Sequence, residues 1–493
     1  MQRSDYGNSC KVQSRTLVLH QMIRRTFSLV LCLSLAAQVC HADGLPERPR
    51  AVLKQQLVPD SAVTVVVRDV GSGESLVELN ATMPRPPAST MKLAPTWAAL
   101  ELLGPAYVWK TRAWSDEPVV KGVLKGNLYL QGGGDPLLTI ERWWRFVTDL
   151  RQTGLRVIEG DIVIDQTRFA AVDERPEDFD GKSWRTYNVL PDPLLVNWQS
   201  ANFVVRPADD ESGVEIAIQP FPAGLVVENR VILTAGRCAG RNRRITITSP
   251  DDALERVVVT GRLSASCVPQ TFRRAVMQPA EYAYGTFVTL WRQSGGEFHG
   301  GMLRAPTPPT ARLLLTQESQ SLAEIVRVTN KYSSNVMART LLLTVAAETS
   351  GTPATTAAGE ASIRQMFVSR GLEFPELVIG NGSGLSRDAR ISGDSMARLL
   401  IGAWSSRYAP EFLASMSLGG LDGTLRRRFE KIEDPSRVRM KTGTLKDVST
   451  IAGYVTGKSG KHYAVVVYIN HPGAQNSVGE LIQAAVIEWV LGQ

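Results

Sequence analysis

The chain has 493 residues, 43% hydrophobic and 21% charged, a composition that excludes a disordered chain and suits about two to four globular domains. The formal net charge is +7, but residues 1–42 carry a surplus of +4, and the other +3 is spread without a dense basic run. The charge therefore indicates a solvated surface and argues against a nucleic-acid-binding protein.

The first 42 residues have the layout of a secretory signal peptide. Basic residues up to Arg25 precede a short apolar run over 27–37, and small residues end the segment at Ala42. The apolar run is shorter than the ~20 residues that span a bilayer, so we expect at most a peripheral attachment to membrane or wall. Met22 is an alternative translation start. Lipid attachment at Cys40 is a second alternative, which the residues before it fit poorly. We expect a mature protein in the periplasm.

The mature part opens with an expected β-hairpin. The apolar run 62–67 predicts a buried strand, 70–74 a turn and 76–79 the return strand. The hairpin leads into the segment 86–92, where two prolines precede Ser89 and favour a helix with this serine in its first turn.

Ser89 and Lys92 stand three residues apart, a spacing that puts both side chains on one helix face. A serine hydroxyl needs a base to become a strong nucleophile, and a lysine serves when burial or nearby positive charge lowers its pKa. After residue 42 the only histidines are His299, His462 and His471, so lysine is the available base. The three histidines have no spacing typical of metal ligands, so neither a metal nor another cofactor is expected. The alternative for this motif alone is a helix-capping serine beside a solvated lysine.

The segment 114–278 is expected to be an inserted accessory region. Short alternating runs such as 161–165 and 244–248, separated by turn signals, predict a mostly β structure. Cys238 and Cys267 are the two cysteines left after signal cleavage, and in an oxidising compartment they predict a structural disulfide. The alternative is a pair of buried thiols.

Helical periodicity returns after residue 278. Ser333-Ser334-Asn335 stands at the start of one expected helix, where the hydroxyl can relay a proton to a leaving amine and the carboxamide can hold a substrate amide. Alone, this run is also an ordinary helix cap. The expected helices cover 281–294, 322–328, 335–347, 356–370, 395–405 and 478–491, and the expected strands cover 451–455 and 463–469.

Lys441-Thr442-Gly443-Thr444 precedes a further strand-like segment, 449–455. The lysine can attract a substrate carboxylate, Thr442 can hydrogen-bond to it, and Gly443 lets the substrate backbone come close. The alternative is a β-turn with a surface lysine. Together these elements predict an α/β catalytic domain whose sheet also includes the N-terminal hairpin.

The three motifs form a known set. Ser-x-x-Lys, Ser-x-Asn and Lys-Thr-Gly, in this order and each in the expected local structure, are typical of penicillin-binding proteins and serine β-lactamases. The chain resembles most closely the class C penicillin-binding proteins of the D-alanyl-D-alanine carboxypeptidase/endopeptidase type. The resemblance spans nearly the whole mature chain, and it is carried by 87–93, 132–137, 160–165, 381–387 and 421–426. The last two segments lie between the second and third motifs, and their glycines and small polar residues predict turns that hold the walls of the cleft.

The resemblance implies a fold and an activity. It implies a penicillin-binding catalytic domain, a sheet flanked by helices, made of 43–113 and 279–493, with 114–278 as a long insertion split into two small β-rich domains. It implies hydrolysis of D-Ala-D-Ala bonds in peptidoglycan stem peptides without a cofactor, and covalent binding of β-lactam antibiotics. It leaves the oligomeric state open.

The resemblance also assigns each motif residue a role in acyl transfer. It makes Ser89 the acylated nucleophile, Lys92 its base, Ser333 and Asn335 the proton relay and substrate-holding pair, Lys441 and Thr442 the carboxylate-binding pair, and the backbone N–H groups of Ser89 and Thr444 the oxyanion hole.

Two features depart from the family pattern. Pro95 lies inside the helix expected to begin at Ser89 and predicts a kink one turn after Lys92. Ser334 stands where some relatives carry Asp, which is tolerable because its side chain need not face the substrate.

A serine β-lactamase is one alternative function, disfavoured by the roughly 240 residues between Lys92 and Ser333 and by the lack of an acidic loop for deacylation. A non-catalytic peptidoglycan-binding scaffold is another, disfavoured by the intact motifs.

Overall fold

The computed structural model describes residues 44–210, 212–250 and 254–493, so the expected signal peptide lies outside the described residues. The architecture is α/β, as the sequence predicted, with a six-stranded sheet and four smaller ones. Within these three ranges, no helix combines the length and the apolar character needed to cross a bilayer.

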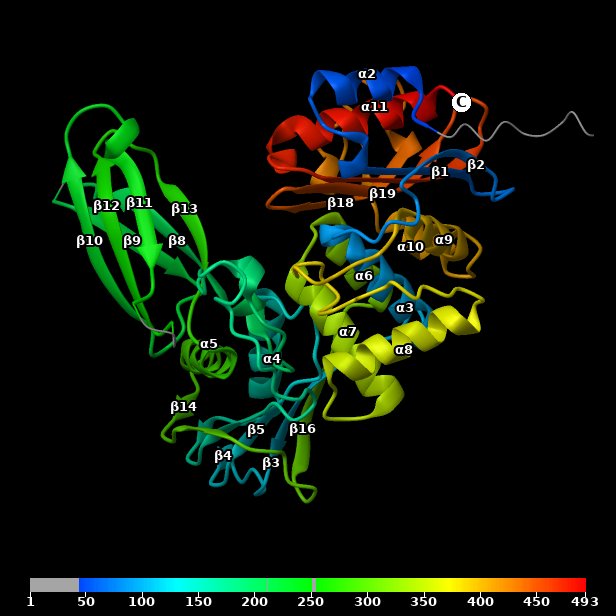
Figure 1. The fold of residues 1–493 in the computed structure, drawn as a ribbon. Coiled ribbons are helices and arrows are strands. Elements are labelled where there is room, and N and C mark those ends of the chain that lie inside the picture. The colour runs from blue at the N-terminus through cyan, green and yellow to red at the C-terminus, as the bar shows by residue number, and fades with distance from the viewer. Residues whose placement is uncertain (1–43, 211, 251–253) are drawn as a thin grey trace, which may run out of the picture. The chain divides into compact units, whose positions relative to one another are not determined.

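The six-stranded sheet joins the two ends of the described chain (Figure 1). Its order is β17-β18-β19-β20-β1-β2, and every neighbouring pair is antiparallel. Val63, Val65 and Val67 of β1 belong to one apolar cluster and Val66 to another, so both faces of the strand are buried, which explains its run of valines. The strands are β1 (Val63–Asp69), β2 (Ser75–Leu79), β17 (Ser417–Leu418), β18 (Val438–Leu445), β19 (Val448–Thr456) and β20 (His462–Asn470).

Helices cover both faces of this sheet (Figure 1). α11 packs on β19 and β20 together with α2, and α9 packs against β1 and β20 from the opposite face. Behind α9, further helices surround α3, which is buried from Leu93 to Leu100 and therefore apolar on all sides. The helices are α2 (Glu47–Gln55), α3 (Leu93–Leu103), α6 (Leu322–Lys331), α7 (Asn335–Ser350), α8 (Thr356–Ser369), α9 (Gly393–Trp404), α10 (Ala409–Ala414) and α11 (Gly479–Leu491).

The segment between α3 and α6 forms the other four sheets. Its first strand, β3, and its last, β16, are neighbours in the five-stranded sheet, so the chain leaves the helical core and returns to it at adjacent strands. These pairings run from 110 to 318, past the limits of 114 and 278 that we expected for the insertion. The elements are β3 (Lys110–Ser115), β4 (Val123–Leu124), β5 (Leu128–Gln131), α4 (Ile140–Gln152), β6 (Val157–Ile158), β7 (Ile162–Asp165), β8 (Ser200–Pro207), β9 (Val214–Gln219), β10 (Val226–Thr234), β11 (Arg243–Thr248), β12 (Arg256–Ser264), β13 (Gln270–Ala275), α5 (Pro279–Gln293), β14 (Glu297–Phe298), β15 (Met302–Arg304) and β16 (Arg312–Glu318).

A helix, α4, interrupts the part of the chain that we expected to be mostly β, and it packs against α5. Trp143, Phe146, Val147 and Leu150 recur at helical spacing and are buried, and Thr139 caps the helix through its side chain. The segment is rich in aromatic residues, which also favour strands. The helix forms and not a strand because helical geometry buries all four of these side chains on one face.

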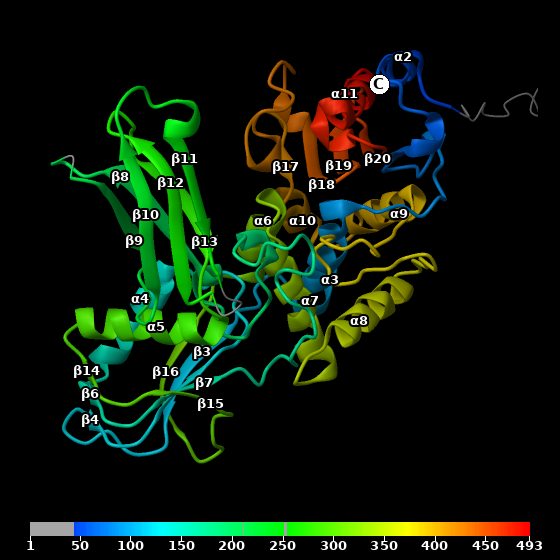
Figure 2. The same cartoon turned by 60° about the vertical axis from the view of Figure 1, so that its left-hand side comes forward.

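The strands β8 to β13 form two three-stranded sheets (Figure 2). Cys238, after β10, and Cys267, between β12 and β13, form the disulfide that the sequence predicted, with a sequence separation of 29. The bond ties two loops of this part of the chain together, and neither cysteine belongs to a catalytic motif. A structural role follows.

Candidate active site

Ser89 lies in a short 3-10 helix, η2 (Ala88–Lys92), that runs directly into α3. The Pro87 carbonyl accepts hydrogen bonds from the hydroxyls of Thr90 and Thr450, both at 2.7 Å, which ties this turn to β19. Ala88 has a left-handed φ of 47°. Ala88 and Thr90 are buried, whereas Ser89 is partly exposed. The candidate nucleophile is therefore held on a fixed turn and open to a substrate.

Pro95 is the third residue of α3, because the α-helix begins at Leu93 and not at Ser89. The N–H groups of the first helical turn have no partner within the helix, so a proline there removes no hydrogen bond. In place of the expected kink, the chain changes from 3-10 to α geometry at Lys92.

Lys92 is fully buried, and three groups surround its amine. Its Nζ lies 2.9 Å from Ser89 Oγ and 2.7 Å from Asn335 Oδ1, and it also contacts the Ser383 carbonyl. A neutral amine has two protons and one lone pair, which suits two acceptors and one hydroxyl donor. Burial lowers the pKa of Lys92 well below the ordinary lysine value, and the nearby charge of Lys441 lowers it further. The amine is therefore placed to accept the proton of Ser89.

Lys441, on β18, is the second buried lysine of the site. Its Nζ donates to Ser333 Oγ at 2.8 Å and to the Thr442 carbonyl at 2.7 Å. Burial lowers the pKa of Lys441 to about 7. Ser333 has a left-handed φ of 56° where the chain passes from α6 to α7. The site therefore contains two serines, Ser89 and Ser333, and two lysines whose pKa values are lowered, Lys92 and Lys441.

Asn335, the first residue of α7, links the site to the inserted region. Its Oδ1 accepts from Lys92, and its Nδ2 donates to the Tyr187 carbonyl at 3.1 Å. Ser334 is the N-cap of α7, and its Oγ accepts from the Met337 N–H at 3.4 Å. An aspartate can cap a helix in the same way, so Ser334 supplies the cap that an aspartate would supply at this position.

Gly443 allows β18 to run against the nucleophile turn. A Cβ at this position would lie 2.7 Å from the Ser89 nitrogen and 2.9 Å from the Pro87 oxygen, so only glycine fits. We had assigned this close approach to the substrate backbone, but in the structure the enzyme's own turn occupies it. Thr444, the next residue, is exposed. The backbones of Ser89 and Thr444 therefore belong to adjoining segments.

Two further groups complete the site and were not singled out from the sequence. The Ser383 carbonyl contacts Lys92, and the Thr424 hydroxyl accepts from the Thr442 hydroxyl at 2.8 Å. They belong to the segments 381–387 and 421–426, which the sequence indicated as turns of the cleft wall. Those turns were the available signal.

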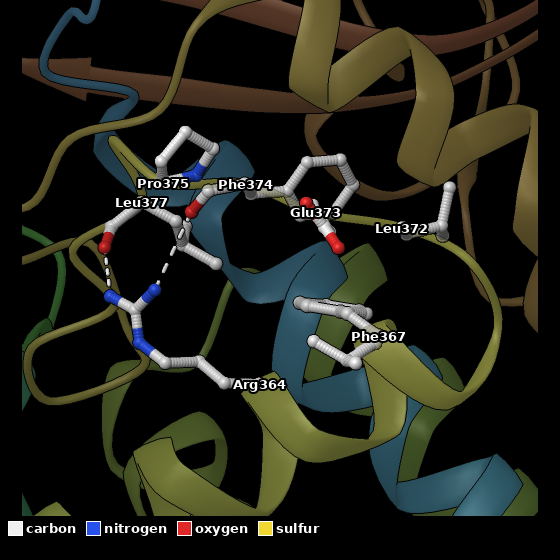
Figure 3. A pocket seen from close by; sticks show the side chains of 8 residues that line it. Arg364, Phe367, Leu372, Glu373, Phe374, Pro375 and Leu377 are labelled. Carbon is white, nitrogen blue, oxygen red and sulfur yellow. Dashed lines mark hydrogen bonds between the residues drawn. The ribbon is translucent and has the colours of Figure 1, made fainter.

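A separate cavity of about 280 Å³ lies beside α8 and the segment that follows it (Figure 3). Aromatic and aliphatic side chains such as Phe367 and Phe374 line it. Arg364 also lines the cavity, and its guanidinium donates to the carbonyls of Phe374 and Leu377 and to the carboxylate of Glu360. None of its lining residues belongs to a catalytic motif, so this cavity is not the candidate active site.

The fold and this set of side chains define the class of penicillin-binding serine enzymes. The sequence model of the D-Ala-D-Ala carboxypeptidase 3 (S13) family matches residues 49–491, and the chain belongs to that family. This confirms the family that the motifs resembled and the enzyme class that they predicted, a serine D-Ala-D-Ala carboxypeptidase.

Relatives match over most of their length. The chain is 28% identical over 468 residues to a D-alanyl-D-alanine carboxypeptidase of Actinomadura sp., with 89% of this chain and 84% of the relative covered. It is 26% identical over 426 residues to D-alanyl-D-alanine carboxypeptidase DacB of Haemophilus influenzae, covering 85% and 87%. The crystal structure of penicillin binding protein 4 from Haemophilus influenzae has the same fold, with a TM-score of 0.78 at 22% identity over 91% of this chain and 100% of that chain.

Proposed function

We propose that this enzyme cleaves D-Ala-D-Ala-type bonds in peptidoglycan stem peptides, as a carboxypeptidase and an endopeptidase, through an acyl-enzyme on Ser89. One observation carries the assignment of residues: Ser89 Oγ lies 2.9 Å from the amine of a fully buried Lys92. A buried amine of lowered pKa beside a serine supplies the base that acyl transfer without histidine requires.

Acylation would use both lysines. Ser89 Oγ attacks the carbonyl of the penultimate D-Ala, a C–O bond forms, and Lys92 takes the hydroxyl proton. The N–H groups of Ser89 and Thr444 would stabilise the oxyanion. As the C–N bond breaks, Ser333 passes a proton to the leaving amine, and Lys441 resupplies Ser333 through the contact between them.

Deacylation restores the enzyme. Before deacylation Lys92 releases the proton that it took from Ser89, and Lys441 regains the proton that it gave to Ser333, by exchange with solvent. A water molecule then loses a proton to the neutral Lys92 and attacks the acyl carbonyl. The C–O bond to Ser89 breaks, Ser89 Oγ takes the proton from Lys92, and the shortened peptide leaves as a carboxylic acid. In the carboxypeptidase reaction Lys441 and Thr442 would hold the carboxylate of the terminal D-Ala. Thr424 is positioned to orient Thr442 through their hydroxyl contact.

β-Lactams would enter the same path. Their ring amide offers a carbonyl to Ser89, and the leaving nitrogen stays tethered, so the acyl-enzyme persists and penicillin becomes a covalent inhibitor. Residues 1–42 would direct the enzyme to the periplasm, where its peptidoglycan substrate lies. The insertion would form separate small domains beside the catalytic domain, with its ends close to the paired strands β3 and β16.

Labelled penicillin tests the proposal. We expect one adduct per molecule, mapped by mass spectrometry to Ser89, together with D-Ala release from a pentapeptide. Ser89→Ala should lose both, whereas Ser72→Ala, in the exposed turn after β1, should lose neither. An adduct on another residue contradicts the assignment. Rapid turnover of penicillin favours the β-lactamase alternative, and the absence of both adduct and D-Ala release favours the scaffold.

The ion pair between the buried Lys331 and the half-buried Asp422, behind the cleft wall, should affect activity. Lys331 Nζ donates to Asp422 Oδ2 at 2.6 Å and to the Met416 carbonyl at 2.9 Å. Asp422 stands two residues before Thr424, which contacts Thr442 in the site. Lys331→Met leaves the Asp422 carboxylate without its cation and should loosen this wall. We expect kcat/KM for D-Ala release to fall about tenfold, measured by steady-state kinetics. Lys431→Met, at an exposed lysine, is the matched control. Unchanged kcat/KM in a folded Lys331→Met would separate the ion pair from catalysis.

A further inference from the structure

A cavity of about 500 Å³ opens beside the second motif. It shares Ser333 and Asn335 with the candidate active site, and its opposite wall comes from the inserted region, where Tyr187, Trp198 and Arg273 lie. The mechanism above uses none of these three side chains. The cavity therefore adjoins the reacting groups, and the mechanism of D-Ala release leaves the side chains of its inserted wall unused.

The inserted wall carries the positive charge of Arg273, which forms no ion pair with any residue that the structure describes. Arg273 Nε donates to Ser200 Oγ at 3.0 Å, and its guanidinium lies 5.2 Å from the centre of the Trp198 ring. These contacts orient the guanidinium, and its two terminal nitrogens form no hydrogen bond with the residues that the structure describes. In the part of the chain that the structure describes, no carboxylate forms an ion pair with Arg273, Arg185 or Arg274.

Two further arginines, Arg274 and Arg185, belong to the inserted region but do not line the cavity. Burial and the like charge of Arg185 lower the pKa of Arg274. Asp180 accepts from the Tyr187 hydroxyl at 2.6 Å and from the Asn188 amide at 2.7 Å. Its negative charge therefore lies on the Tyr187 side of the wall, bound to neutral donors and not to Arg273. An arginine held in one plane without an acid suits a carboxylate, which it can bind through two parallel hydrogen bonds.

The proposed mechanism decides which part of the substrate reaches the cavity. Because Ser333 hands its proton to the leaving amine, that amine must lie at Ser333 as the bond breaks. In D-Ala release the amine belongs to a single small residue, whose carboxylate goes to Lys441 and Thr442. In the cleavage of a cross-link the amine belongs to a second stem peptide, and the space that adjoins Ser333 is this cavity.

We propose that the cavity is the subsite for the leaving peptide of a cross-linked dimer and that Arg273 binds a carboxylate of that peptide. The inference rests on the proposed function and adds a specificity residue to it. Arg273 touches no reacting atom, so it favours the endopeptidase reaction over D-Ala release. Trp198 on the inserted wall offers apolar surface to the rest of the peptide. Tyr332 on the facing wall, which is 71% exposed, offers more.

Arg273→Gln separates the two reactions. We expect kcat/KM for purified cross-linked muropeptide dimers to fall about tenfold, mainly through KM, because one charge-assisted contact is lost. D-Ala release from a monomeric pentapeptide and penicillin acylation of Ser89 should keep their wild-type rates. Arg273→Lys keeps the charge and loses the planar fork, so its loss should be smaller. Arg244→Gln, at an exposed arginine of β11 outside the cavity, is the matched control.

A second measurement uses only the wild-type enzyme as its reference. Dimers whose free carboxylates on the leaving peptide are amidated should be cut about tenfold more slowly by wild type, and Arg273→Gln should lose nothing further on them. Equal losses on dimer and pentapeptide, or no loss on either, overturn the subsite. A wild type that releases D-Ala and leaves dimers intact overturns it while D-Ala release stands. A wild type without D-Ala release or penicillin adduct refutes the proposed function itself.

Discussion

Lys92→Met is expected to slow penicillin acylation of Ser89 by about three orders of magnitude, the size of effect typical for losing a general base. The methionine side chain fills similar space without a lone pair that can take the hydroxyl proton. Stopped-flow acylation with a fluorescent penicillin measures the rate. Lys446→Met, at an exposed lysine in the turn between β18 and β19, should acylate at the wild-type rate.

A stability measurement must accompany this variant. Removing the amine leaves Asn335 Oδ1 and the Ser383 carbonyl without a donor, which costs about 1–3 kcal/mol for each buried group left unsatisfied. We therefore expect a lower Tm but a folded protein at 25 °C. Wild-type acylation by folded Lys92→Met would mean that another group serves as the base.

The three motifs could be predicted because each is a short run whose residue types meet one chemical need. Their meeting point could not. The distance between Lys92 and Asn335 depends on how α3 packs against α7, and the contact between Lys441 and Ser333 depends on how β18 lies beside the α6–α7 turn. Neither follows from spacing along the chain.

Backbone groups mark the limit of prediction from residue type. Ser383 and Tyr187 act on the site through their carbonyl oxygens, which every residue possesses, so their side chains give no signal. Gly443 shows a related limit. The sequence indicated that something passes close to this glycine, but only the fold identifies the neighbour as the backbone of Ser89.

The pH dependence of acylation should reveal that the two lysines interact. Ser89 is activated only while Lys92 is neutral, and the pKa of Lys92 is lowered by burial and then by the charge of Lys441. The acylation rate therefore rises with pH through this pKa. Lys441→Met removes the neighbouring charge, so the pKa of Lys92 rises and the rising limb moves to higher pH. At a fixed pH on the limb, the variant therefore acylates more slowly than the wild type.

Stopped-flow acylation with penicillin across the pH range measures the limb, and its position, unlike its height, is independent of weaker penicillin binding. Lys441→Arg keeps the charge and should leave the limb near the wild-type position. A limb that does not move in Lys441→Met would show that the charge of Lys441 does not act on the base.

The shape of the wild-type limb provides a second criterion. Burial lowers the pKa of Lys441 to about 7, so its charge is present at acid pH and disappears as the pH rises through neutrality. Two amines that repel each other lose their protons in separate steps, and the apparent pKa values belong to the pair. The wild-type limb should therefore be broader than a single titration, whereas Lys441→Met should follow a one-proton curve. A one-proton curve in both would mean that the lysines titrate independently, although they lie in the same pocket.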